Sequence, residues 1–215
     1  MPNRSLVIVP VDGSQETERT VQYAVTVAKK HDADVHAIHV VPRDGTLWVA
    51  PEKETALRAR LRALRPAAEE EGVLVRIVTL RGTPERVIPA YAQLNGANLI
   101  IVGRRYGSPR LWRNSRVASR LSRSSPVPVL VVPARRGGAA DVSWKRIVAA
   151  VDFTVASAMA LRTAVDLSRR HGARLTILHA MDAPRRMVLS GGEAWRLVQR
   201  LATEAKVIAQ RLKDK

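Results

Sequence analysis

Between residues 5 and 133, short apolar runs alternate with longer amphipathic stretches. The apolar runs are rich in Val and Ile, which is typical of strands that are buried on both faces of a parallel sheet. A strand is therefore predicted for each run, over residues 5–11, 34–41, 74–81, 99–103 and 127–132.

The stretches between the runs have the periodicity of helices. Apolar residues recur at i, i+3, i+4 and i+7 in the first stretch, at Val21, Ala24, Val25 and Ala28. Helices are predicted over residues 15–31, 52–71, 83–94 and 115–124, with a loop over residues 43–51. Alternating strands and helices of this length predict an α/β fold with right-handed crossovers.

Local signals refine two of these helices. Pro66 lies inside the leucine stripe of the second helix, so a kink or break is expected there. Thr83, Pro84 and Glu85 offer a hydroxyl cap, a proline in the first turn and an acid, which together mark a helix start.

Gly103 ends the fourth predicted strand, where a doubly wound sheet binds ligands. A glycine permits a sharp turn that exposes backbone N–H groups, and a following helix start favours anions. Seven arginines and no acid lie between Gly103 and Arg123. This pattern predicts a phosphate site, although an ordinary turn followed by a solvated basic face is the alternative.

The chain after residue 143 repeats its beginning. A shift of 140 residues aligns the two segments without a gap, placing Val11, Asp12, His31 and His39 on Val151, Asp152, His171 and His179. The second copy predicts strands over residues 146–151 and 174–180, and helices over 156–171 and 193–213. The expected organisation is a complete domain (1–134), a linker (135–143) and a truncated β-α-β-α repeat (144–215).

The net charge is +17, and no acid occurs between Glu85 and Asp141 while ten arginines do. Such an excess attracts the phosphates of nucleotides, nucleic acid or anionic lipid, and equally it can serve solubility alone. The sequence shows no nucleic-acid-binding motif, so a nucleic-acid partner is only an alternative.

Other chemistry has little support. The chain has no cysteine, no apolar run long enough for a membrane span, and no G-x-S-x-G motif. Its five histidines have no metal-ligand spacing, and no paired carboxylates flank the glycine loop. The expectation is a cytoplasmic protein with no catalytic or metal site, and at most very slow ATP hydrolysis.

Five short motifs together resemble the universal stress protein family. They are PVDGS (10–14), HVV (39–41), Gly-Thr-Pro (82–84), IIVGRR (100–105) and PVPVLVVP (126–133). The resemblance implies a Rossmann-like, five-stranded parallel sheet of order 3-2-1-4-5 between helices, with ATP binding in many members. It also implies a homodimer through the last strand, here from Val127 to Val132.

The phosphate loop of nucleotide-binding members reads G-x2-G-x9-G-S/T. The first glycine matches Gly103, the second falls on Tyr106 beside Gly107, and Ser115 and Arg116 replace the final pair. Either Tyr106 and Arg116 fill the pocket, or arginines replace backbone N–H groups as phosphate donors. Weak ATP or ADP binding is therefore expected, with a dimeric regulator that binds no nucleotide as the alternative.

The resemblance assigns the nucleotide to residues at the ends of three strands. Asp12 and Val40 are expected near the adenosine, and the segment from Gly103 to Val117 around the phosphates. Helix capping by Asp12 and core packing by Val40 are the alternatives, and His39 and His179 are expected to be structural. The expected set is Pro10, Val11, Asp12, Gly13, Ser14, Val40, Val102, Gly103, Arg104, Arg105, Gly107, Ser115, Arg116 and Val117.

Overall fold

The computed structural model describes residues 4–41, 51–104, 116–133, 144–152 and 154–180. The chain divides into two compact units, residues 1–142 and 143–215. Each unit is described by itself.

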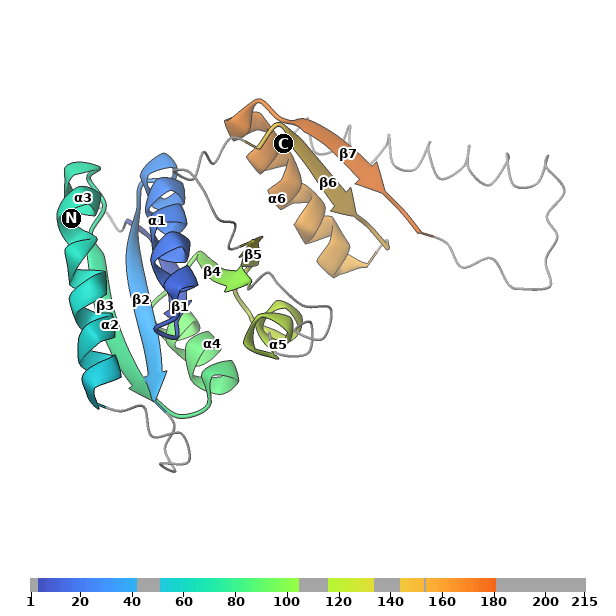
Figure 1. The fold of residues 1–215 in the computed structure, drawn as a ribbon. Coiled ribbons are helices and arrows are strands. Elements are labelled where there is room, and N and C mark those ends of the chain that lie inside the picture. The colour runs from blue at the N-terminus through green and yellow to red at the C-terminus, as the bar shows by residue number, and fades with distance from the viewer. Residues whose placement is uncertain (1–3, 42–50, 105–115, 134–143, 153, 181–215) are drawn as a thin grey trace, which may run out of the picture. The chain divides into compact units, whose positions relative to one another are not determined.

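The first unit is a parallel sheet between two layers of helices (Figure 1). The strand order is β3-β2-β1-β4-β5, which confirms the predicted order 3-2-1-4-5. Its elements are β1 (Ser5–Val11), α1 (Gln15–Lys30), β2 (Ala33–Val41), α2 (Pro51–Ala63), α3 (Arg65–Glu70), β3 (Val75–Arg81), α4 (Pro84–Leu94), β4 (Leu99–Arg104), α5 (Arg116–Ser124) and β5 (Val129–Pro133).

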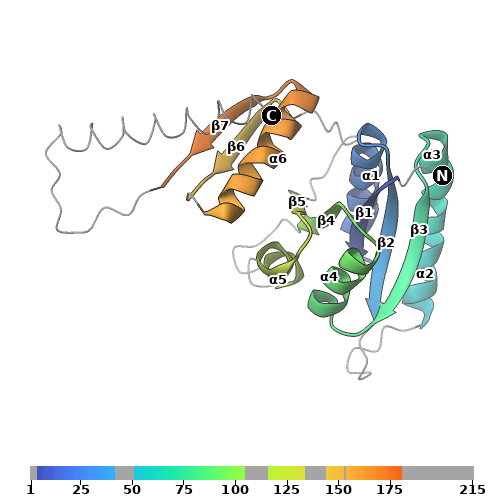
Figure 2. The ribbon, with the colours of Figure 1, turned by 180° about the vertical axis from the view of Figure 1, so that it is seen from behind.

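Both faces of the central strands are buried, as the unbroken apolar runs predict. Alternate side chains of β1 take opposite faces, so Leu6 and Ile8 pack in the core beneath α4 and α5. Val7 and Val9, also buried, face the side on which α1 and α2 lie (Figure 2). The sheet is thus held between two apolar layers, and its strand ends emerge together at one edge.

The break expected near Pro66 is present. α2 ends at Ala63 and α3 begins at Arg65, which places Pro66 in the first turn of α3. A proline is tolerated there because the first N–H groups of a helix have no intrahelical acceptor. Pro51, placed in a loop by its sequence, likewise opens α2.

Two local predictions need correction. Thr83 stands at the N-cap of α4, but its hydroxyl makes no capping hydrogen bond; its carbonyl accepts the N–H groups of Arg86 and Val87. The last strand begins at Val129 rather than Val127. Pro128 has no N–H to donate, and only its carbonyl joins the ladder, accepting from Ile100 N–H at 2.9 Å.

The second unit contains β6 (Arg146–Ala150), α6 (Val155–His171) and β7 (Arg174–Leu178). Its two strands are parallel neighbours, and α6 packs a small core of Ala149, Leu161 and Ala164 against them. The helix predicted over residues 193–213 lies outside the described residues.

Each unit contains the same two hydrogen-bonded contacts at corresponding positions. His39 Nδ1 lies 3.2 Å from the carbonyl oxygen of Val11, and His179 Nδ1 lies 2.6 Å from that of Val151. The carboxylate after each first strand also accepts the N–H two residues on, from Ser14 to Asp12 and from Thr154 to Asp152, both at 3.0 Å. A shift of 140 residues converts each contact into its counterpart.

The Asp152 turn gives a prediction about titration. Hydrogen bonds from the Thr154 hydroxyl and amide lower the pKa of Asp152 from 3.8 to about 2. Because this pKa is lower in the folded state, the stabilisation is present above the unfolded value and is lost as the pH falls through about 2. Replacing Thr154 by Ala removes the hydroxyl but keeps the amide, so NMR titration should show the pKa of Asp152 rising toward 3.8.

Thr163→Ala is the matched control for this titration. Thr163 is also exposed, and its hydroxyl bonds within α6 to the carbonyl of Met159. The pKa of Asp152 should stay near 2 in that variant. An unchanged pKa in Thr154→Ala would contradict the role given to the hydroxyl.

Candidate functional site

The candidate site lies at the carboxyl ends of β1 and β4. These strands are neighbours in the sheet although β2 and β3 come between them in the chain. Their ladder pairs Val7 with Leu99 and Ile8 with Ile100. Both strands then continue, β1 to Val11 and β4 to Arg104, without further pairing to each other. This is the topological switch point, where open α/β sheets bind ligands.

The turn after β1 is built around the carboxylate of Asp12. Asp12 Oδ1 accepts the Ser14 N–H at 3.0 Å and the Thr17 hydroxyl at 3.1 Å. Thr17 Oγ1 in turn lies 3.4 Å from the N–H of Asp12. The Asp12 side chain is exposed while Thr17 is buried. The carboxylate is therefore held in a fixed orientation from below and faces solvent.

Gly13 and Arg60 complete this turn. Gly13 has φ +78°, a left-handed conformation that favours glycine. Arg60 Nη1 donates to the carbonyl of Gly13 at 3.2 Å, and Arg60 also forms an ion pair with Glu18. The arginine thereby ties α2 to the start of α1 through the turn.

Gly103 allows α1 to pack directly against β4. A Cβ atom built on Gly103 would fall well inside contact distance of the hydroxyl oxygen of Thr20. Thr20 is itself buried. The sequence predicted Gly103 as part of a ligand-binding turn. The structure shows that helix–strand packing requires a glycine at this position as well.

Thr17 and Thr20 were not predicted as part of the site. Both lie on the buried face of α1, three residues apart, directly before the apolar Val21 and Ala24. Two hydroxyl residues at the start of an apolar helical face are the signal that could have revealed them, because buried hydroxyl groups need hydrogen-bond partners.

His39 lies beside this turn in β2 and is buried. A carbonyl oxygen can only accept, so the contact with Val11 places the ring proton on Nδ1. Nε2 is buried with no hydrogen-bond partner. The histidine fastens the end of β2 to the end of β1, which agrees with the structural role expected for it.

The structure places the predicted residues in three groups. Pro10, Val11 and Val40 end β1 and β2, and Asp12 to Ser14 form the turn. Val40, Val102 and Val117 pack in the core beneath α4 and α5. Gly103 and Arg104 end β4, and Arg116 begins α5. Arg105, Gly107 and Ser115 lie outside the described residues.

Val40, Val102 and Val117 support the site from beneath, because each contributes its side chain to the core. The polar groups that the structure brings together at the β1 end are those of Asp12, Ser14 and Thr17, with Arg60 reaching in from α2. Among the described residues, no group of three or more His, Asp or Glu side chains is arranged to hold a metal ion.

Two stretches of the chain, residues 4–133 and 143–214, match the profile of the Universal stress protein family. The chain belongs to this family. A curated universal stress protein of Methanocaldococcus jannaschii is 33% identical over 138 residues, which cover 59% of this chain and 80% of that protein.

Solved structures of the family share this fold. A universal stress protein from Archaeoglobus fulgidus DSM 4304 superposes with a TM-score of 0.66 at 17% identity, covering 94% of this chain and 72% of its own. Another from Archaeoglobus fulgidus, solved in complex with dAMP, has a TM-score of 0.47 at 22% identity and covers 59% of this chain and 96% of its own.

The contact between Gly103 and Thr20 gives a prediction about stability. Gly103→Ala adds a methyl group where Thr20 already lies, so it should destabilise the universal stress protein fold by about 1–3 kcal/mol. Removing the hydroxyl with Thr20→Ala should recover part of this loss in the double variant. Urea unfolding of the two single variants and the double variant measures the coupling.

Gly96→Ala is the control for that cycle. A Cβ at Gly96 meets nothing within 4 Å, and its cost would come from its φ of +61° alone. Its effect should simply add to that of Thr20→Ala. Additivity of Gly103→Ala with Thr20→Ala would show that the two residues do not restrict each other.

Proposed function

We propose that this universal stress protein is a stress-response module that binds an adenine nucleotide weakly at the ends of β1 and β4. The observation that carries the proposal is the early end of the β1–β4 ladder at Ile8 and Ile100. Beyond it, the Asp12 turn and Gly103 emerge at the same edge of the sheet, at its switch point.

The chemistry at this edge suits the two ends of a nucleotide. The exposed carboxylate of Asp12 accepts hydrogen bonds, as a ribose hydroxyl or an exocyclic amine requires. The start of α5 supplies backbone N–H groups and the positive end of a helix dipole, which favour phosphate. Arg116 adds a full positive charge at this helix start.

Binding rather than turnover is the activity that this site supports. The Asp12 carboxylate is engaged by Ser14 and Thr17, which fits it for orienting a ligand more than for moving protons. Occupancy of a weak site follows the nucleotide concentration, and the occupied and empty forms would differ at this edge of the sheet.

Calorimetry tests the nucleotide. Wild-type protein should bind ATP or ADP with micromolar or weaker affinity, and Arg116→Ala should reduce the affinity about tenfold because a charge-assisted bond to phosphate is lost. Arg123→Ala, in the last turn of the same helix, is the control and should leave binding unchanged. Equal binding by wild type and Arg116→Ala would remove the role given to this arginine.

Mass spectrometry of the denatured, purified protein supplies a second measurement. A co-purified adenine nucleotide would support the proposal. Absence of both co-purified and titratable nucleotide would instead favour the regulator that binds no ligand.

The same protein is proposed to be a homodimer through β5. β5 is the last strand in the sheet order, and its only strand neighbour among the described residues is β4. Val131 is 39% exposed on this strand, an apolar side chain at an edge that invites pairing. Pairing of β5 with its copy about a two-fold axis would close both edges at once.

Leu130→Lys tests this assembly. A lysine on β5 places like charges near each other across the two-fold axis, so light scattering at micromolar concentration should change from dimer to monomer or aggregate. Leu94→Lys is the matched control, because Leu94 is 86% exposed on α4, away from the edge. A wild-type monomer under the same conditions would contradict the proposal.

A further inference from the structure

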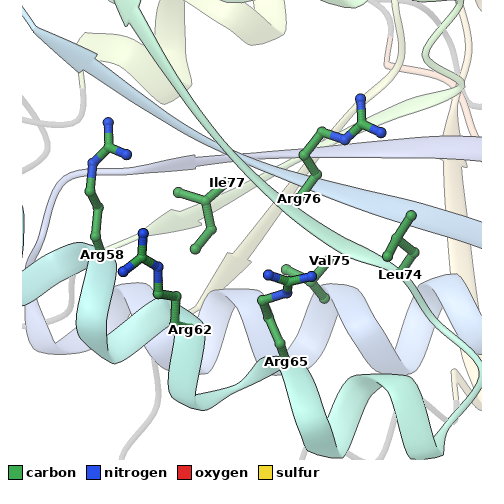
Figure 3. Close-up of a pocket in the computed structure, with 7 residues that line it drawn as sticks. All are labelled: Arg58, Arg62, Arg65, Leu74, Val75, Arg76 and Ile77. Atoms are coloured by element: carbon green, nitrogen blue, oxygen red, sulfur yellow. The ribbon is translucent and has the colours of Figure 1, made fainter.

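A hollow of about 310 Å³ lies at the opposite edge of the sheet, where α2 and α3 run beside β3. Figure 3 shows the side chains that line it, which are Arg58, Arg62, Arg65, Leu74, Val75, Arg76 and Ile77. The nucleotide proposal does not use this place, since β3 is the strand farthest in sheet order from β4 and β5.

The backbone of β3 is open on the side of the hollow. β3 ends the sheet, so only β2 pairs with it among the described strands. The N–H of Val35 donates to the carbonyl of Leu74 at 2.9 Å, which sets the phase of the ladder. In a parallel pair, alternate residues turn their backbone groups toward the neighbour. Val75, Ile77 and Thr79 therefore turn theirs away from β2. Val75 is fully buried, so the accessible part of this edge is at Ile77 and Thr79.

Three arginines form a row beside this edge. Arg58, Arg62 and Arg65 follow one another at i, i+4 and i+7 along α2 and α3, and their side chains rise from the helices toward β3 (Figure 3). Arg58 Nη2 donates to Thr79 Oγ1 at 2.7 Å. At the other end, the N–H of Val73, just before β3, donates to the carbonyl of Ala68 in α3. The row thus runs antiparallel to the strand.

The spacing of the row suits an extended peptide. Successive arginines are about 4.5–6 Å apart along the helix axis. Side chains on one face of a strand recur about every 6.6 Å. Over three positions the two repeats differ by about 3 Å, which long arginine side chains can absorb.

The arginines keep positive charge available. Arg58 pairs with Glu54 at 3.2 Å and Arg65 with Glu69 at 3.5 Å, both at the surface. Arg62 has no carboxylate within ion-pair distance in the part of the chain that the structure describes. Beneath them, Val75 is fully buried and gives the hollow an apolar floor.

Arg76 is not part of the row. Its side chain points away from α2 (Figure 3). It lies near His36 on the face that α4 covers, where burial first and the Arg76 charge second lower the pKa of His36. The cations that overhang the open edge are therefore those of the two helices.

We propose that the open edge of β3 binds an extended acidic segment of a partner protein as an added strand. The accessible backbone groups of Ile77 and Thr79 pair with the segment, and the arginine row binds acidic side chains at its alternate positions. This mode of recognition takes affinity from main-chain hydrogen bonds and specificity from the side-chain repeat. It is independent of the proposed nucleotide site.

A second copy of this chain is the wrong occupant. Pairing β3 with another β3 would bring two arginine rows together, and facing like charges oppose association. A small anion could use the arginines, but it would leave the backbone edge unpaired. An acidic strand satisfies both features.

Two labelled peptides test the proposal by fluorescence anisotropy at low ionic strength. The probe is an eight-residue peptide of alternating Glu and Val, and its control replaces each Val by Pro. The control has the same charge but lacks half of the N–H donors and resists the β conformation. Only the Glu-Val peptide should bind. Tripolyphosphate carries charge but no backbone to pair with β3, so it should displace the bound peptide only weakly.

Arg62→Gln with Arg65→Gln should weaken binding of the Glu-Val peptide about tenfold. Both side chains are exposed, and Gln is a good helix former, so the fold should persist. Arg86→Gln with Arg146→Gln removes the same charge from exposed positions elsewhere and should have little effect. An equal loss in the two double variants would show binding to net charge and overturn the proposal.

Amide hydrogen exchange provides a readout that charge alone does not move. The bound peptide should slow exchange at Ile77 and Thr79, which face the open edge, and leave Val78 and Leu80, already paired with β2, unchanged. Equal affinity for the Glu-Pro peptide, or binding without protection at Ile77, would rule out strand addition.

Discussion

Burial of both faces of one parallel sheet is the constraint on which the first unit depends. A strand that is apolar on both faces needs a helical layer above and below it, and parallel neighbours can be joined only through crossovers. The same constraint sends every strand in one direction, so the ends of β1, β2 and β4 emerge together. The Asp12 turn and Gly103 lie at the same edge of the sheet because burial of their apolar side chains keeps β1 and β4 parallel.

This constraint also explains which features the sequence could reveal. Strands with apolar side chains on both faces appear as continuous runs, and Pro66 lies inside the leucine stripe of a long predicted helix, so both the strands and the break were predictable. The hydrogen bond between Thr17 and Asp12 was not, since it depends on how the turn after β1 places the Asp12 carboxylate against the first turn of α1. That the Thr83 hydroxyl makes no capping hydrogen bond could not be predicted either, because a residue's suitability as a cap does not fix its rotamer.

The second unit meets the same constraint with fewer elements. α6 covers one side of β6 and β7, and Ala149, Leu161 and Ala164 are buried there. On the alternate positions, Val148 and Leu178 remain 62% and 54% exposed. Among the described residues, only one face of this two-stranded sheet is therefore buried. The turn after β6 and the histidine contact nevertheless match those of the first unit.

The register of the two strand pairs has a consequence for how this sequence can vary. In each unit the first strand pairs with the second at a separation of 28 residues, as Ser5 with Ala33 and Arg146 with Arg174. Changing that separation by one residue would turn the second strand over and exchange its inner and outer faces. The two copies differ at most positions of this segment, yet they align over it without a gap. Chain length, more than residue identity, is what the two β-α-β segments have in common.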